Sequence, residues 1–254
     1  MGKVLKLIVT MLLIGNISAF AQNDDYELTP AKTQSISALL SDILNNKREK
    51  VVKHISYPLY RRYPLPSIKN EAEMLKYYDI IFTEDFKNQV AQKKNKIWSI
   101  GWRGINVCED LMWVNFWDDK LEVHRIWYES AKEQSLWKDA IEKRKLRLHP
   151  SVRTFISPKY IITTNKYTIM IDKITEGKND DIYRYACWKR GRDLSEKPDL
   201  ILNNGTMDLL GSMALFSFTF TNGIYKYIII QGESLMVYKN DILILEDEIV
   251  NTEG

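Results

Sequence analysis

The chain has 254 residues, a formal net charge of +3 and an aromatic content of 11%. This small charge argues against a general nucleic-acid binder, which usually carries a strong basic excess on one face. The length suits one large domain or two smaller ones. The aromatic residues are typical of small β domains with interlocking faces, although they could also line a carbohydrate or peptide groove.

The first 21 residues have the pattern of a cleavable secretory signal. Lys3 and Lys6 give a positive start, residues 7–14 form a short apolar core, and small residues precede a cleavage site after Ala21. The core is too short for a membrane span of ~20 residues, and no Cys follows it to carry a lipid anchor. We therefore expect export to the periplasm or the medium, with Gln22 as the mature N-terminus.

Helical spacing dominates the region before residue 100. Residues 36–44 carry an apolar stripe, Asn70 and Glu73 have capping-box character, and a further short helix is expected from Thr83. Residues 57–66 hold three prolines between these helices, which excludes a regular helix there.

A three-strand meander follows if residues 109–110 and 118–119 are two-residue turns. Strand alternation then predicts that one face packs on the preceding helices. This face would hold Arg103, Ile105, Val107, Met112, Val114, Phe116, Leu121, Val123 and Arg125. A strongly charged helix over residues 131–148 is predicted next, and His149-Pro150 ends it.

From residue 152 onward the signals are nearly all β. Asn222-Gly223 favours a type I′ turn, which would pair Phe220 with Tyr225, Phe218 with Tyr227 and Phe216 with Ile229. A second hairpin is expected to turn at Asn240-Asp241, pairing Tyr238 with Leu243 and Met236 with Leu245. Further strands are predicted at 159–164, 167–174, 181–189 and 199–203.

These elements predict an α+β chain. N-terminal helices pack on a curved antiparallel meander, and an antiparallel β barrel or sandwich follows. The expected divisions are residues 1–21 as the signal peptide, 22–150 as the helical and meander domain, and 151–254 as the barrel or sandwich domain.

Two groups of cationic and aromatic residues are candidate ligand or partner contacts. Arg103 and Arg125 fall on the apolar face of the meander, so they must pair with acids or receive an anionic group at the mouth of a pocket. Tyr60, Arg61 and Arg62 form a basic-aromatic cluster in the proline-rich segment, which suits either a contact surface or a solvated loop.

Cys108 and Cys187 are the two cysteines, and both fall in predicted strands. In an exported chain they could form a disulfide, although two separate buried thiols are the favoured interpretation. His54, His124 and His149 lack the spacing of a metal pair, and serine-nucleophile and phosphate-loop motifs are missing from the sequence. We therefore predict no metal site, no cofactor and no catalytic residue.

Several short motifs carry a resemblance. The order helix, helix, meander resembles part of an NTF2-like cone fold, and residues 183–188, 197–200 and 222–225 resemble motifs of uncharacterised exported proteins of Gram-negative bacteria. Trp188 and Lys189 begin a four-residue stretch similar to the aromatic-x-Lys-Gly turn of periplasmic lysozyme inhibitors of the small-barrel kind. That turn makes Trp188 and Lys189 further candidate partner contacts.

Export, aromatic loops and a small barrel favour a non-catalytic periplasmic binding or inhibitory protein whose partner is an envelope or secreted protein. A structural accessory of an envelope assembly is the second hypothesis. The third is a small-molecule enzyme with a cone pocket around Arg103, with a neighbouring acid as base.

Overall fold

The computed structural model describes residues 28–254 except positions 97, 102, 176–180 and 211–214. The predicted signal peptide and its cleavage site lie outside the described residues. Among the described helices, none combines the length and apolar character that a bilayer span requires.

Side-chain caps fix where the N-terminal helices begin. Thr29 accepts a hydrogen bond from the Lys32 amide, and the predicted cap residue Asn70 accepts one from the Glu73 amide. Thr83 likewise caps the next helix. The helical segments are α1 (Pro30–Leu44), α2 (Arg48–Val51), the 3-10 turn η2 (Val52–His54), α3 (Glu71–Ile81) and α4 (Glu84–Lys93).

A four-stranded antiparallel sheet follows, with strand order β1-β2-β3-β4. Its strands are β1 (Ser99–Gly101), β2 (Gly104–Val107), β3 (Met112–Trp117) and β4 (Lys120–Ile126). The apolar faces of the helices and the sheet form one buried cluster that includes Ile36, Tyr78, Phe86, Val107 and Val114. The expected packing of helices on the meander is confirmed, and β1 adds a strand that the sequence analysis did not predict.

The predicted face of the meander is correct for its apolar residues and wrong for both arginines. The register holds from Val107–Met112 to Val114–Val123, but a β-bulge then pairs Trp113 with Arg125. This bulge turns Arg125 out of the core, so the residue is exposed to solvent. Arg103 is also exposed, because it lies in the turn between β1 and β2.

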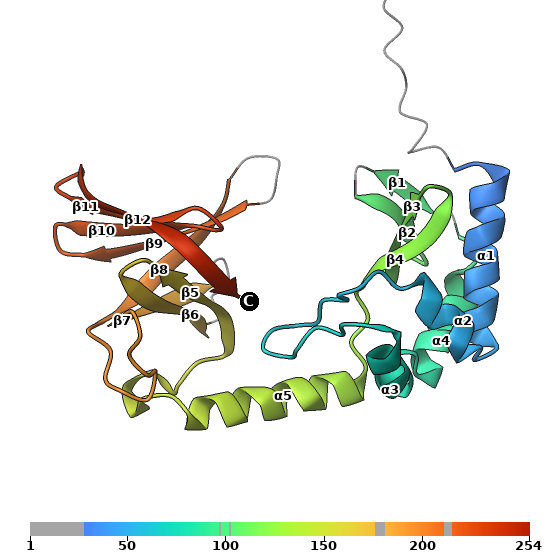
Figure 1. Ribbon diagram of the computed structural model, residues 1–254, viewed down its shortest axis with the longest axis horizontal. Coiled ribbons are helices and arrows are strands. Elements are labelled where there is room, and N and C mark those ends of the chain that lie inside the picture. Colours follow the sequence, from blue (N-terminus) through green and yellow to red (C-terminus); the bar gives the residue numbers. More distant parts are fainter. Residues whose placement is uncertain (1–27, 97, 102, 176–180, 211–214) are drawn as a thin grey trace, which may run out of the picture.

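Helix α5 (Ala131–Leu146) runs from the sheet to the second part of the molecule, an eight-stranded closed antiparallel barrel (Figure 1). The barrel order is β10-β11-β12-β5-β6-β7-β8-β9. Its strands are β5 (Ser157–Thr164), β6 (Tyr167–Thr175), β7 (Ile182–Lys189), β8 (Leu200–Leu210), β9 (Leu215–Asn222), β10 (Tyr225–Ile230), β11 (Ser234–Lys239) and β12 (Ile242–Glu253).

Large aromatic side chains fill the barrel interior. Tyr183 packs edge-on against Phe218, and Tyr185 packs against Phe220. A Cβ atom added to Gly205 would lie 2.1 Å from the Phe220 ring, so the glycine makes room for it. This interior is a packed core.

Two predicted hairpin registers need correction. In the first hairpin the pairs are Phe220–Tyr227 and Phe218–Ile229, two residues away from the prediction. The turn sits at Gly223, whose φ is +60°, and Ile224, so it resembles type II′ and not the predicted type I′. A shift of two residues leaves every side chain on its predicted face.

The second hairpin has the predicted turn and the predicted pair of Tyr238 with Leu243. A bulge after that pair places Leu245 opposite Val237, so the expected pairing with Met236 is wrong.

Candidate functional site

A proline-rich loop between η2 and α3 forms one wall of the candidate site. Its start is attached to the edge of β4, where the Ser56 amide donates to the Val123 carbonyl at 2.9 Å. Farther along, the Trp137 indole of α5 donates to the Tyr63 carbonyl at 2.8 Å. The loop therefore lies against both β4 and α5.

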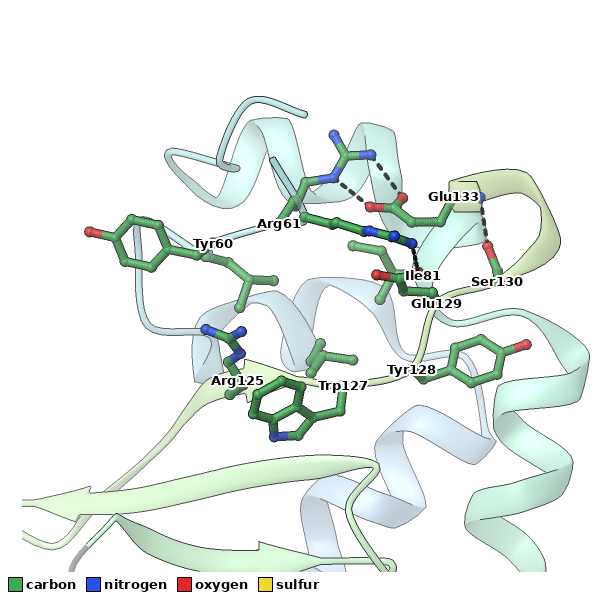
Figure 2. Close-up of a pocket in the computed structure, with 12 residues that line it drawn as sticks. Tyr60, Arg61, Ile81, Arg125, Trp127, Tyr128, Glu129, Ser130 and Glu133 are labelled. Atoms are coloured by element: carbon green, nitrogen blue, oxygen red, sulfur yellow. Dashed lines mark hydrogen bonds and ion pairs between the residues drawn. The ribbon is translucent and has the colours of Figure 1, made fainter. Parts of the chain in front are cut away.

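The pocket beneath this loop has a volume of about 240 Å³. Its lining comes from residues 59–62 of the loop, Ile81, residues 125–130 after the bulge in β4, and Glu133 of α5. Figure 2 shows Tyr60, Arg125 and Trp127 near one end, and the pair of Arg61 with Glu133 near the other. Four of the seven predicted contact residues, Tyr60, Arg61, Arg62 and Arg125, line this one pocket.

Arg61 is held in place by a buried ion pair with Glu133. Two hydrogen bonds of 2.7 and 2.8 Å join the groups, and their side chains are only 4% and 9% exposed. Burial alone lowers the pKa of Arg61, but the hydrogen bonds and charge of Glu133 outweigh burial and raise it. Arg61 thus keeps its charge, which Glu133 compensates, and its side chain forms part of the pocket wall.

Glu133 reaches Arg61 because of how α5 begins. Ser130 accepts a hydrogen bond from the Glu133 amide at 3.0 Å and donates to the Ile80 carbonyl. This cap places Glu133 in the first helical turn, facing the loop.

Arg62 is partly neutralised. Its guanidinium lies 3.3 Å from the Glu129 carboxylate and 3.4 Å from the centre of the Trp137 ring. Both Arg62 and Glu129 are partly exposed, so this ion pair is a weak one.

Arg125 differs from the other two arginines of the pocket. Its guanidinium lies 4.2 Å from the centre of the exposed Trp127 ring, and within the described residues it forms no ion pair with a carboxylate. Partial desolvation of the guanidinium lowers the pKa of Arg125 from its ordinary value, although the residue as a whole is exposed. An anion bound here would supply the missing charge.

The other candidate residues lie elsewhere. Arg103 is in the β1–β2 turn, outside the lining of this pocket. Trp188 is fully buried on the outer wall of the barrel, where its indole donates to the Glu196 carbonyl, so its ring is not available to a partner. Lys189 beside it is exposed.

The two cysteines are free and lie in different core clusters. Cys187 is in β7 as predicted, but Cys108 lies in the turn after β2 with φ of +58°, not in a strand. Burial raises the pKa of each thiol to about 11.

The sequence analysis missed Trp127, Glu129 and Glu133 as pocket residues. One available signal was the spacing of Ser130 and Glu133, which matches a capping box and marks the start of α5. Trp127 follows the bulge in β4 directly, and no local pattern predicted that bulge.

Among the described residues, no group of three or more His, Cys, Asp or Glu side chains is placed to hold a metal ion. Comparison with protein-family models, curated proteins and solved structures finds no match for this chain. The strand order shows an α+β arrangement with a C-terminal barrel. The resemblance to NTF2-like and exported Gram-negative proteins stays a prediction, as does the division near residue 150.

Proposed function

We propose that this chain is an exported, non-catalytic binding protein of the periplasm or the medium, and that its pocket receives an anionic group of its partner. The observation that carries this proposal is Arg125. It faces the pocket beside exposed aromatic rings and has no carboxylate partner among the described residues.

The neighbours of Arg125 suggest what accompanies the anion. Tyr60 and Trp127 are 65% and 52% exposed, so their rings can contact a planar or apolar group next to the charge. A guanidinium favours a carboxylate or another planar anion, because it donates two parallel hydrogen bonds. The class of ligand we propose is an aromatic or apolar group that bears a carboxylate.

Hippurate, an aromatic ring joined to a carboxylate, is a simple probe of this site, and hippuramide is its uncharged match. Isothermal titration should show saturable binding of hippurate and weaker binding of hippuramide. Arg125→Gln should weaken hippurate binding at least tenfold, as expected for a lost charge-assisted pair. The matched control, Arg103→Gln, should change it less than twofold.

Equal binding of both compounds, or an unchanged affinity in Arg125→Gln, would refute the site. Hippurate binding must also saturate at millimolar concentration, because a pocket that binds aromatic carboxylates should bind this simple one. Without saturable binding at that concentration the site is refuted.

Export is tested separately. When the full chain is expressed in a Gram-negative host, mass spectrometry of the periplasmic fraction and the medium should find a chain that begins at Gln22. A full-length chain confined to the cytoplasm would contradict this part of the proposal.

A further inference from the structure

Strand β12 changes its neighbour halfway along its length. Its first part, residues 242–248, pairs with β11, whereas residues 249–253 pair with β5. The pairing with β5 starts only at Thr164 and Ile249. Within the described part of the chain, no strand pairs with the second edge of residues 242–248, so this edge is open.

The turn that precedes this edge determines which backbone N–H and C=O groups point toward it. Asn240 and Asp241 have φ of 47° and 62°, as a type I′ turn requires. In such a hairpin the closing pair, here Lys239 with Ile242, exchanges hydrogen bonds across the two strands. The N–H and C=O groups of the next residue, Leu243, then point to the open edge.

The same stretch is apolar and exposed. Ile242, Leu243 and Ile244 are 69%, 45% and 53% exposed. Consecutive residues of a strand point to opposite faces, so both faces of the strand are exposed here. Open edges in soluble proteins are usually protected by Lys, Pro, inward-pointing charges or β-bulges. These three positions carry no Lys, Pro or charge, and the bulge at Ile244 is the one such device among them. An exposed apolar edge of this kind is a template for one more strand.

Acidic side chains lie at the far end of this edge. A hollow of about 570 Å³ near the β5–β6 turn is lined by four acids and one cation, Glu233, Glu246, Asp247, Glu248 and Lys166. Asp247 accepts a hydrogen bond from the Lys166 amide at 3.1 Å. Among the described residues, no Lys or Arg side chain forms an ion pair with Glu233, Glu246 or Glu248.

We propose that the open edge of β12 binds an extended, basic peptide segment of a partner protein as an added strand. The backbone of the segment pairs with Leu243, its apolar side chains cover Ile242 and Ile244, and its Lys or Arg side chains reach the acidic hollow. The excess of acids over the single Lys166 in this hollow decides the charge of the occupant. This surface is separate from the pocket at Arg125.

The probe is a blocked octapeptide of alternating Val and Lys with a fluorescent label, and its match alternates Val and Glu. Fluorescence anisotropy with the purified protein should show saturable binding of the Val-Lys peptide that weakens with added salt. The Val-Glu peptide should bind at least tenfold more weakly. A double variant, Glu246→Gln with Glu248→Gln, should lose most of the salt dependence.

Ile244→Lys places a charge on the open edge and should weaken Val-Lys binding at least tenfold. Its matched control is Val250→Lys, because Val250 is an exposed apolar residue of the same strand in the part that pairs with β5. The control should bind within twofold of the original chain, and the circular dichroism of both variants should match it.

Equal binding of the two peptides, or equal losses in Ile244→Lys and Val250→Lys, would overturn the proposal. A chain that binds neither peptide and forms dimers in sedimentation, which Ile244→Lys abolishes, would also overturn it. The edge would then pair with a second copy of the chain.

Discussion

The aromatic residues of the barrel interior and those of the pocket differ in burial. In the barrel, Tyr185 and Phe220 are at most 1% exposed and pack against each other at a centroid distance of 5.4 Å. At the pocket, Tyr60 and Trp127 leave more than half of their surface in solvent. A single composition therefore supplies buried core rings and solvent-exposed pocket rings, and the aromatic content alone could not distinguish them.

The largest expected effect on stability is in the barrel. Phe220→Ala removes a fully buried ring that lies over Gly205 and leaves a cavity, so the free energy of unfolding should fall by about 4 kcal/mol. Urea denaturation followed by circular dichroism measures it. The exposed counterpart, Tyr60→Ala, should lower the free energy of unfolding by less than about 0.5 kcal/mol. Similar losses in both variants would break the comparison.

The next largest effect concerns the wall of the pocket. Glu133→Ala leaves the buried guanidinium of Arg61 without its two hydrogen bonds and should lower the free energy of unfolding by about 3 kcal/mol. The matched control is Glu129→Ala, because its ion pair with Arg62 is partly exposed and should contribute less than about 1 kcal/mol. A larger loss for Glu129→Ala than for Glu133→Ala would reverse our assignment of the buried pair.

A smaller effect per group is expected from the thiols at high pH. Burial raises the pKa of Cys108 and Cys187 from 9.0 to about 11, so between these values the unfolded chain ionises while the folded chain stays protonated. The free energy of unfolding should therefore decrease as the pH rises from 9 to 11, by on the order of 2 kcal/mol per thiol. A variant with both cysteines changed to Ala should show a shallower slope, and an identical slope would count against buried thiols.

The last prediction involves no change in stability and concerns the accessibility of the two thiols to alkylation. Without reductant, iodoacetamide at neutral pH should leave the folded chain unmodified, and it should label both cysteines once urea is added. Mass spectrometry separates these states. A chain that resists labelling even in urea would show that the two cysteines form a disulfide.

Much of the fold follows from local patterns. Helix caps at Asn70 and strand alternation at Phe216 to Phe220 are local signals, so the elements and their faces could be predicted. The predicted strand registers were wrong at the β-bulges and at the Gly223 turn, because the register there depends on how neighbouring strands pair. Bulges insert one residue without a sequence signature strong enough to locate them.

The site was predicted only in part, for the same reason. The arginines were recognised as costly on an apolar face, but the bulge opposite Trp113 resolves that conflict by turning Arg125 into the pocket. Arg61 meets Glu133, 72 residues away along the chain, through a tertiary contact that no local spacing reveals. Residue types indicated the chemistry, and the chain path decided which of them meet.

The most direct test of the account is a nitrogen–proton correlation spectrum recorded while hippurate is added. We predict that the Arg125 Nε–H and Trp127 indole signals move together and saturate, whereas those of Arg103 and the exposed Trp117 stay in place. Signals of Arg125 and Trp127 that remain fixed at saturating hippurate, or that move no more than those of Arg103 and Trp117, would contradict an anion site at Arg125.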